Sequence, residues 1–353
     1  MNEIFEICQF DSPSDNLKSK SGPADQNLKW VGFLAILLLL VGCVETADAQ
    51  QPKKVARICY LGNSDSGPAA IYLKTFRERA REIGYIDGQN LTIESRYWEG
   101  KIERLPSLAA EVVRLNCDVI LTTGTEAAEA AKNATKTIPV VMAFAADAVR
   151  RGIVADLAHP GGNITGLTDM SAELYGKRLE LLKETVPKLS RVAVLWSPTN
   201  PNAADELKEV ETVARFLRVE VQSLAVKGPD DFEGAFQAAT KKRAQALMVG
   251  GGGFLNAHNK RIVELAAKNR LPAMYPAVPY VEAGGLMVYG EDRAEMFRRA
   301  AEIVDKVLKG TKPADIPVER PKKFDFVINL KAAKQIGLTV PPEVLARASR
   351  IIR

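Results

Sequence analysis

The chain has 353 residues, which is long for a single core and suits two α/β domains. Aromatic residues make up only 7% of the chain, which argues against a base-stacking surface for nucleic acid. The formal net charge is +5, and it becomes +9 when the first 49 residues, with three basic and seven acidic side chains, are set aside. Because the Lys and Arg residues are dispersed, the charge indicates a solvated basic surface rather than a nucleic-acid site.

The amino terminus resembles an export signal. An apolar run over residues 30–44 follows Lys29, and it is too short to span a bilayer comfortably but typical of a signal peptide. Residues 47–49 (Ala-Asp-Ala) form a small-residue cleavage site, whereas residues 40–43 (Leu-Val-Gly-Cys) resemble a lipobox in which Cys43 would be lipidated. Three outcomes stay open: a free periplasmic protein, a tethered lipoprotein and an uncleaved anchor.

About 28 residues, net acidic, precede Lys29, the positive charge of this signal, which is unusual. We hypothesise that translation starts at Leu28 through an alternative start codon. Amino-terminal sequencing of the precursor tests this hypothesis, and a precursor that contains Cys8 contradicts it.

Two cysteines lie beyond the leader. Cys59 and Cys117 each fall in, or at the start of, a predicted strand, where a small buried residue is expected. Export permits a disulfide between them, but their offsets from the two strand ends differ, so we expect them to be unpaired.

Strands and helices alternate from residue 53 onward, which predicts parallel sheets covered on both faces. Strands are predicted at 55–61, 91–96, 118–122, 138–143, 164–168, 191–196, 219–224 and 246–249, with short apolar segments at 272–275 and 286–289. Helices are predicted at 68–83, 102–115, 126–134, 172–185, 203–216, 231–240, 256–269 and 292–308.

The alternation breaks at residues 160–163 (Pro-Gly-Gly-Asn) and then restarts. The predicted fold class is α/β, with two doubly wound parallel-sheet lobes joined by a multi-strand hinge. We expect a leader over 1–49, a first lobe over 53–165 plus about 293–316, and a second lobe over 166–292 plus about 317–353. Loops at the carboxyl ends of both sheets would then surround one cleft.

Polar and glycine-rich segments follow the predicted strands, and we expect them to bind a ligand. The candidate residues are Asn63, Ser64, Asp65, Ser66, Thr123, Gly124, Thr125, Phe144, Asp147, Ser197, Asn200, Gly252, Phe254, Tyr275, Glu291 and Asp292.

Three roles are expected within this set. Residues 123–125 (Thr-Gly-Thr) would hold a carboxylate at a helix amino terminus, where backbone N–H groups and the helix dipole favour an anion. Asp292 would face an ammonium group, and Tyr275 or Phe254 would stack on an apolar part of the ligand. Helix capping by Thr125 and Asp292 is an equally good interpretation of those two residues.

Catalytic groups are scarce. His159 and His258 are the only histidines, and their surroundings in the sequence show no metal-ligand spacing. The glycine run at 250–253 lacks the Gly-Lys-Ser/Thr ending of a phosphate-binding loop, and no nucleophile elbow occurs. We therefore expect no enzyme, no cofactor and no metal site.

Several segments together resemble the tryptophan/tyrosine-type family of ABC transporter substrate-binding proteins over about residues 53–347. They are Tyr-Leu-Gly at 60–62, Gly-Tyr-Ile-Asp-Gly-Gln-Asn at 84–90, Thr-Gly-Thr at 123–125, Ile-Pro-Val-Val at 138–141, Pro-Gly-Gly-Asn-Ile-Thr-Gly at 160–166, Tyr-Gly at 289–290, Ala-Ala-Glu-Ile-Val-Asp-Lys at 300–306, Leu-Lys-Gly at 308–310, Lys-Pro-Ala-Asp-Ile-Pro-Val-Glu at 312–319 and Val-Ile-Asn-Leu-Lys at 327–331.

The resemblance implies a type I periplasmic-binding fold, a small organic ligand such as an aromatic amino acid, and a partner permease with its ATPase. It implies a periplasmic location, with membrane contact only through the permease or a lipid anchor. Two segments depart from the family: Ala148 follows Asp147 where relatives have Pro, and Glu291 precedes Asp292 where relatives have Pro. A ligand-sensing protein of a signalling system and a Rossmann-like enzyme such as a glycosyltransferase stay as alternatives.

Overall fold

The computed structural model describes residues 55–64, 70–169 and 171–353. The leader, the proposed lipidation at Cys43 and the candidate residues Asp65 and Ser66 lie outside the described residues. Within the described part of the chain, no helix has both the length and the apolar character needed to cross a membrane.

The first sheet has five parallel strands in the order β2-β1-β3-β4-β5. Their bounds are β1 (Ala56–Gly62), β2 (Leu91–Tyr97), β3 (Val119–Thr123), β4 (Val140–Ala146) and β5 (Ile164–Asp169). The central strands are short apolar runs buried along almost their whole length, as expected for a sheet with helices on both faces.

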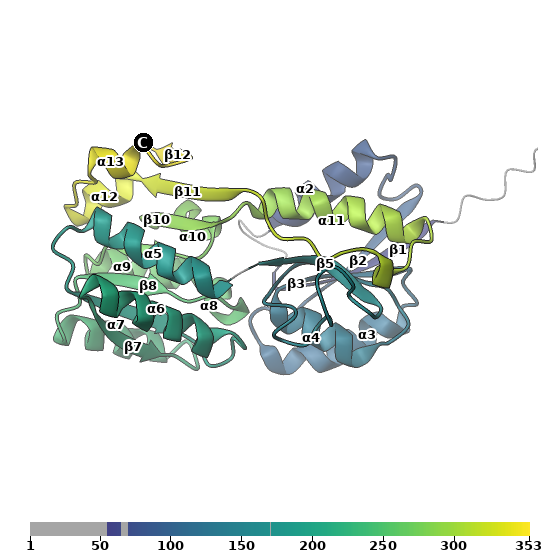
Figure 1. Cartoon of the computed structure of the whole chain (residues 1–353), viewed down its shortest axis with the longest axis horizontal. Coiled ribbons are helices and arrows are strands. Elements are labelled where there is room, and N and C mark those ends of the chain that lie inside the picture. Colours follow the sequence, from purple (N-terminus) through teal and green to yellow (C-terminus); the bar gives the residue numbers. More distant parts are fainter. Residues whose placement is uncertain (1–54, 65–69, 170) are drawn as a thin grey trace, which may run out of the picture. The chain divides into compact units, whose positions relative to one another are not determined.

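Helices α2 (Ala70–Glu82), α3 (Leu105–Arg114), α4 (Thr125–Ala134) and α11 (Arg293–Leu308) cover this sheet, with a short η2 (Ile102–Arg104) before α3. Helix α11 comes late in the chain yet lies beside α2 (Figure 1), where Phe297 and Phe76 share one buried core. We call these strands and helices the first lobe.

The second sheet has seven strands in the order β12-β11-β10-β9-β8-β6-β7. They are β6 (Arg191–Trp196), β7 (Glu220–Ala225), β8 (Ala246–Val249), β9 (Ala273–Tyr275), β10 (Met287–Glu291), β11 (Phe324–Asn329) and β12 (Arg350–Ile352). Neighbours are parallel except β10 and β11, which pair antiparallel. The sequence did not predict β11 and β12, so this sheet is larger and more mixed than expected.

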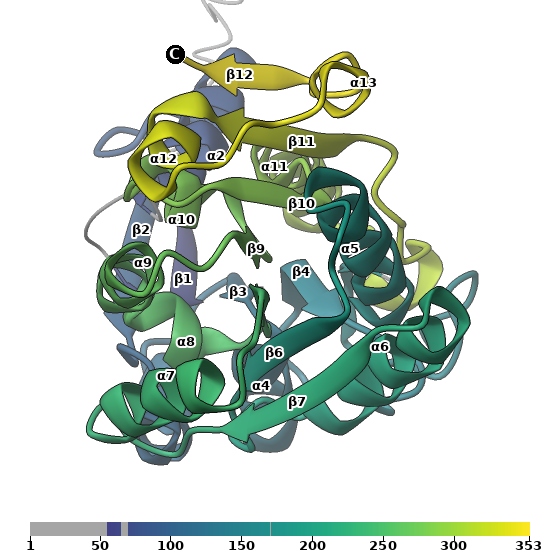
Figure 2. The same ribbon diagram turned by 90° about the vertical axis from the view of Figure 1, so that its left-hand side faces the viewer.

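The second lobe consists of this sheet with α5 (Ser171–Thr185), α6 (Ala203–Leu217), α7 (Asp231–Lys241), α8 (Gly253–Ala257), α9 (Asn259–Lys268), α10 (Val278–Glu282), α12 (Leu330–Ile336) and α13 (Pro342–Leu345). Helices α5 and α6 pack side by side (Figure 2). The single helix predicted at 256–269 is two helices that meet at His258.

The predicted junction between the lobes near residue 165 was wrong, because β5 pairs with β4 and completes the first sheet. The chain passes between the sheets after β5, between β10 and α11, and between η3 (Pro313–Asp315) and β11. Two of these passages are hydrogen-bonded to each other, since the Asp292 N–H donates to the Lys323 carbonyl at 3.0 Å. The passage after β5 begins beside the segment between η3 and β11, where the Thr168 N–H donates to the Glu319 carbonyl at 2.9 Å.

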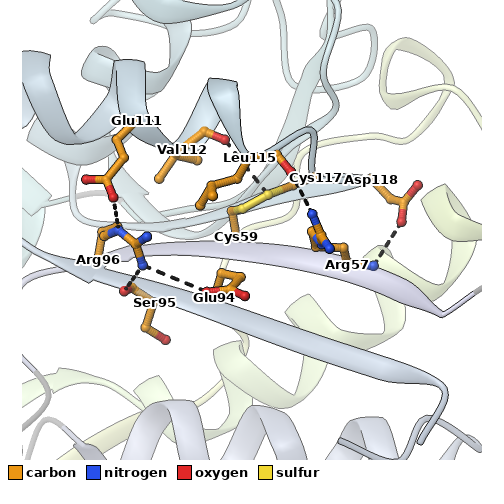
Figure 3. Close-up of a disulfide and its surroundings, with 10 residues drawn as sticks. All are labelled: Arg57, Cys59, Glu94, Ser95, Arg96, Glu111, Val112, Leu115, Cys117 and Asp118. Atoms are coloured by element: carbon orange, nitrogen blue, oxygen red, sulfur yellow. Dashed lines mark hydrogen bonds and ion pairs between the residues drawn. A yellow bond between two sulfur atoms is a disulfide. The ribbon is translucent and has the colours of Figure 1, made fainter. Parts of the chain in front are cut away.

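Cys59 and Cys117 form a disulfide with their Cα atoms 5.8 Å apart, so the expectation that they are unpaired was wrong (Figure 3). Strand offsets misled because Cys117 lies in the turn before β3, where Asn116 has φ 50°. That turn is fixed against β1 by the Arg57 N–H, which donates to Asp118 Oδ2 at 2.8 Å. The disulfide therefore ties the α3–β3 turn to β1, an interior strand of the first sheet.

Candidate functional site

A cavity of about 480 Å³ is lined by residues from the carboxyl ends of strands in both sheets and from the helices that follow them. In the first sheet, β2 lies beside β1 on one side and β4 lies beside β3 on the other, so the strand order reverses between β1 and β3. In the second sheet, the strand order reverses in the same way between β6 and β8. These are the switch points at which open α/β sheets bind ligands.

Gly253 of the second lobe is held by two side chains of the first lobe. Its N–H donates to Glu126 Oε1 at 3.0 Å, and its carbonyl accepts from Asn63 Nδ2 at 3.0 Å. A Cβ at Gly253 would overlap the ring of Trp98, so only glycine allows this approach. The glycine run thus lets the two lobes meet at one edge of the cavity.

A second contact between the lobes involves Asn202, whose Nδ2 donates to Thr125 Oγ1 at 3.2 Å. Two more contacts join the lobes: Arg151 donates to the Pro201 carbonyl at 3.2 Å, and Arg150 pairs with Asp205 at 3.4 Å. The exposed Arg150 pair contributes little to stability, but it adds to the polar contacts beside the buried one.

Aromatic side chains of the first lobe form an apolar wall. Tyr72 stacks on Phe297 with ring centroids 5.6 Å apart, and the Arg293 guanidinium lies 4.4 Å from the centroid of Phe144. Tyr60 and Trp98 also line the cavity and are buried. Such a wall suits a planar apolar group, since stacked and edge contacts between rings are favourable.

Carboxyl groups lie in the same cavity. Asp169, at the end of β5, is 7% exposed, and burial raises its pKa well above the usual range. Repulsion from Glu291 adds to this rise and attraction to Arg293 opposes it. Burial also raises the pKa of Glu126, against the effect of the Gly253 N–H.

The second lobe contributes a buried polar cluster. Arg178 is 3% exposed; its Nε donates to the Tyr289 carbonyl at 2.6 Å, and its guanidinium lies 4.5 Å from the centroid of the Tyr175 ring. Glu206 accepts from Asn200 Nδ2 at 3.1 Å. A buried charge needs such partners, because an unpartnered one is costly.

A family model described as "ABC transporter substrate binding protein" matches residues 67–352. The chain belongs to this family. Its members are solute-binding proteins rather than a class of enzymes, and substrate-binding proteins of ABC transporters are extracytoplasmic.

The chain is similar to three other proteins that can be compared with it. The "Tyrosine-binding protein" of Clostridioides difficile is 27% identical over 265 residues, which is 75% of this chain and 76% of the relative. A Streptococcus structure in complex with L-Trp has a TM-score of 0.77 at 29% identity, covering 84% of this chain and 99% of the other. A conserved domain protein from Vibrio cholerae has a TM-score of 0.78 at 28% identity, covering 84% and 100%.

Nine of the candidate residues line the cavity of this family member. They are Asn63, Ser64, Thr123, Gly124, Thr125, Phe144, Asn200, Gly252 and Glu291. They come together because parallel strands present their carboxyl ends to one edge of the sheet.

Five candidate residues do not line the cavity. Asp292 caps α11 by accepting from the Glu295 N–H at 2.9 Å. Asp147 pairs with Arg150, and the Ser197 hydroxyl lies 3.0 Å from that of Thr199.

The two expected stacking residues are core residues instead. Phe254 stacks on Phe232, and Tyr275 stacks on Tyr280, all within one core cluster of the second lobe. Thr125 does not cap α4: its hydroxyl accepts from the Ala146 N–H at 2.9 Å as well as from the other lobe.

The sequence interpretation missed several lining residues. Tyr175, Arg178 and Glu206 lie in the first two turns of helices rather than in the preceding loops. The i, i+3 spacing of Tyr175 and Arg178 was the available signal, because it places both on one helix face. Asp169 was missed because its strand was assigned to the other lobe.

Proposed function

We propose that this protein is the extracytoplasmic solute-binding component of an ABC importer and that it captures an aromatic amino acid or a similar small molecule. The observation that carries the proposal is one cavity with an aromatic wall from the first lobe and buried charged groups around it. A volume of about 480 Å³ suits a small organic ligand. The relatives that are named for tyrosine or hold L-Trp support this ligand class.

Closure of the two lobes is the proposed mechanism. The lobes would be residues 55–169 with 293–319 and residues 171–291 with 324–352, moving about the three passages between the sheets. The contacts of Gly253 and Asn202 across the cavity would form on closure. A ligand that touches both lobes stabilises the closed state, and the permease with its ATPase would engage that state.

Export by the amino-terminal signal, with or without a lipid at Cys43, is part of the same proposal. A periplasmic binding protein needs no catalytic residues, and the polar groups of the cavity are arranged to hold a ligand rather than to activate a nucleophile. Transport rather than signalling is proposed because the family model is that of a transporter component.

A thermal-shift screen of the purified protein tests the function. The panel contains the twenty amino acids, purines, nucleosides and small carboxylates. We expect L-tryptophan or L-tyrosine to raise the melting temperature, because a ligand that binds only the folded state stabilises it. If another class raises it and aromatic amino acids do not, the ligand class is wrong and the binding function stands; if no compound shifts it, the proposed function fails.

A further inference from the structure

We propose that Asp169 is the residue that selects the ligand, by binding its ammonium group, and that the ligand carboxylate contributes much less. The substrate class is then arylalkyl amines in general, with aromatic amino acids as members. This inference rests on the proposed function, because it concerns the same cavity.

Asp169 has an unused acceptor. Its side chain is 93% buried, and Oδ1 has no hydrogen-bond partner among the described residues. A buried acceptor left without a donor is destabilising, and the penalty is larger for a charged group. Because the side chain lines the cavity, a ligand donor is the natural partner.

The charges around Asp169 favour a cation. Glu291 and Glu206 repel the ionised carboxylate, and Arg293, the cation that stabilises it, is stacked on Phe144. Asn202 adds another acceptor to the cavity wall, since its Oδ1 is buried without a partner in the described part of the chain. An ammonium group has three N–H donors and a positive charge, so it meets both needs.

Arg178 is the buried cation of the cavity, and it is already engaged; Arg293 lies on the Phe144 ring, and Lys260 and Arg261 are exposed. Arg178 donates to the carbonyls of Tyr289 and Pro276 and lies against the Tyr175 ring. A ligand carboxylate at Arg178 therefore adds to a group that has partners, whereas a ligand ammonium at Asp169 fills a place that has none among the described residues. From this asymmetry we infer that the amine dominates affinity.

Two matched sets of probes separate the two groups by calorimetry. One set is L-tyrosine, tyramine and 3-(4-hydroxyphenyl)propionate; the other is L-tryptophan, tryptamine and indole-3-propionate. In the set whose amino acid binds, we expect the amine to bind within about tenfold of the amino acid and the carboxylate to be weaker by about 100-fold or more. A carboxylate that binds as well as the amine overturns the inference and leaves the proposed function in place.

Asp169→Asn tests the residue itself, because it removes the charge and keeps the shape. We expect it to weaken amine and amino acid alike by about 30-fold or more. The control is Asp147→Asn, whose carboxylate pairs with Arg150 outside the cavity and whose loss should leave affinity within about twofold. Unchanged affinity in Asp169→Asn overturns the inference; if that variant does not fold, the probe sets on the native chain decide alone. If neither amino acid binds, this inference and the proposed ligand class fail together.

Discussion

The side of the cavity built by the first lobe differs in chemistry from the side built by the second. The first lobe presents the rings of Tyr72, Trp98 and Phe144 beside the buried carboxyls of Asp169 and Glu126. The second lobe presents Arg178 and Glu206, which are held by their own hydrogen bonds. Neither lobe alone provides the whole lining of the cavity. From this difference we infer that ligand specificity requires both lobes to line one cavity, whereas the folding stability of each lobe depends on that lobe's own contacts.

The largest effect is expected from the disulfide, which belongs to the first lobe alone. Replacing both Cys59 and Cys117 by Ala should lower the free energy of unfolding of that lobe by about 4 kcal/mol, for a sequence separation of 58 residues. Hydrogen exchange should show loss of protection in β1 and β3 and little change in β6 and β8. Equal loss in both sheets would contradict the separation of the lobes in stability.

Gly253→Ala disrupts the contact between the two lobes at Gly253. The added Cβ overlaps the Trp98 ring and displaces the N–H that Glu126 accepts, so ligand affinity should fall by about 100-fold. Gly234→Ala in α7 is the matched control, because nothing lies within 4 Å of its added Cβ. It should leave affinity unchanged and raise stability by about 0.5–1 kcal/mol. Calorimetry and thermal melts measure both, and equal affinities in the two variants would refute the role of Gly253.

Much of the first lobe followed from the sequence. Short apolar strands and amphipathic helices predicted β1 to β4, and Asn63 and Gly252 of the glycine-containing loops line the cavity. Local periodicity does not determine the order of strands within a sheet, so β5 was assigned to the wrong lobe. Asp169, at the end of β5, was therefore not recognised as a candidate site residue. Strand β11 was not expected, because about residues 317–353 were assigned to the second lobe with no strand or helix predicted there.

The chemistry of the second lobe was harder to predict for a different reason. Its charged groups lie on α5 and α6, and a charged residue on a helix is usually on the solvated face. Only the packing shows that Arg178 points inward, to the carbonyl of Tyr289. The same packing converts Phe254 and Tyr275 from expected ligand contacts into core residues.

Phe144→Ala tests whether the aromatic wall contributes to ligand affinity. It removes a cavity-lining ring and the surface on which Arg293 lies, so affinity for an aromatic ligand should fall by about tenfold. Phe216→Ala is the control, because that ring is 88% exposed on α6. Calorimetry should find it unchanged, and a loss of affinity no greater in Phe144→Ala than in Phe216→Ala would remove Phe144 from the site.

The smallest effect is a pH dependence of stability. Burial raises the pKa of Asp169 in the folded chain above its unfolded value, so its contribution to stability is lost as pH rises through the folded pKa. Between about pH 7.5 and pH 5.5, the melting temperature of the ligand-free protein should therefore rise, and the rise should be smaller in Asp169→Asn. The carboxyls of Glu82 and Glu319, whose pKa values are lowered by arginines, act in the opposite direction, and only at lower pH. An identical pH dependence in both proteins would contradict the raised pKa of Asp169.

Fluorescence of Trp98 tests the central claim most directly, because this ring lies at the edge of the cavity where the lobes meet. The protein is titrated with L-tyrosine or tyramine, which do not contribute tryptophan emission. We expect a saturable change in emission that persists in Trp196→Phe and disappears in Trp98→Phe. Saturable binding in calorimetry with no change in Trp98 emission would place the ligand elsewhere and contradict the account.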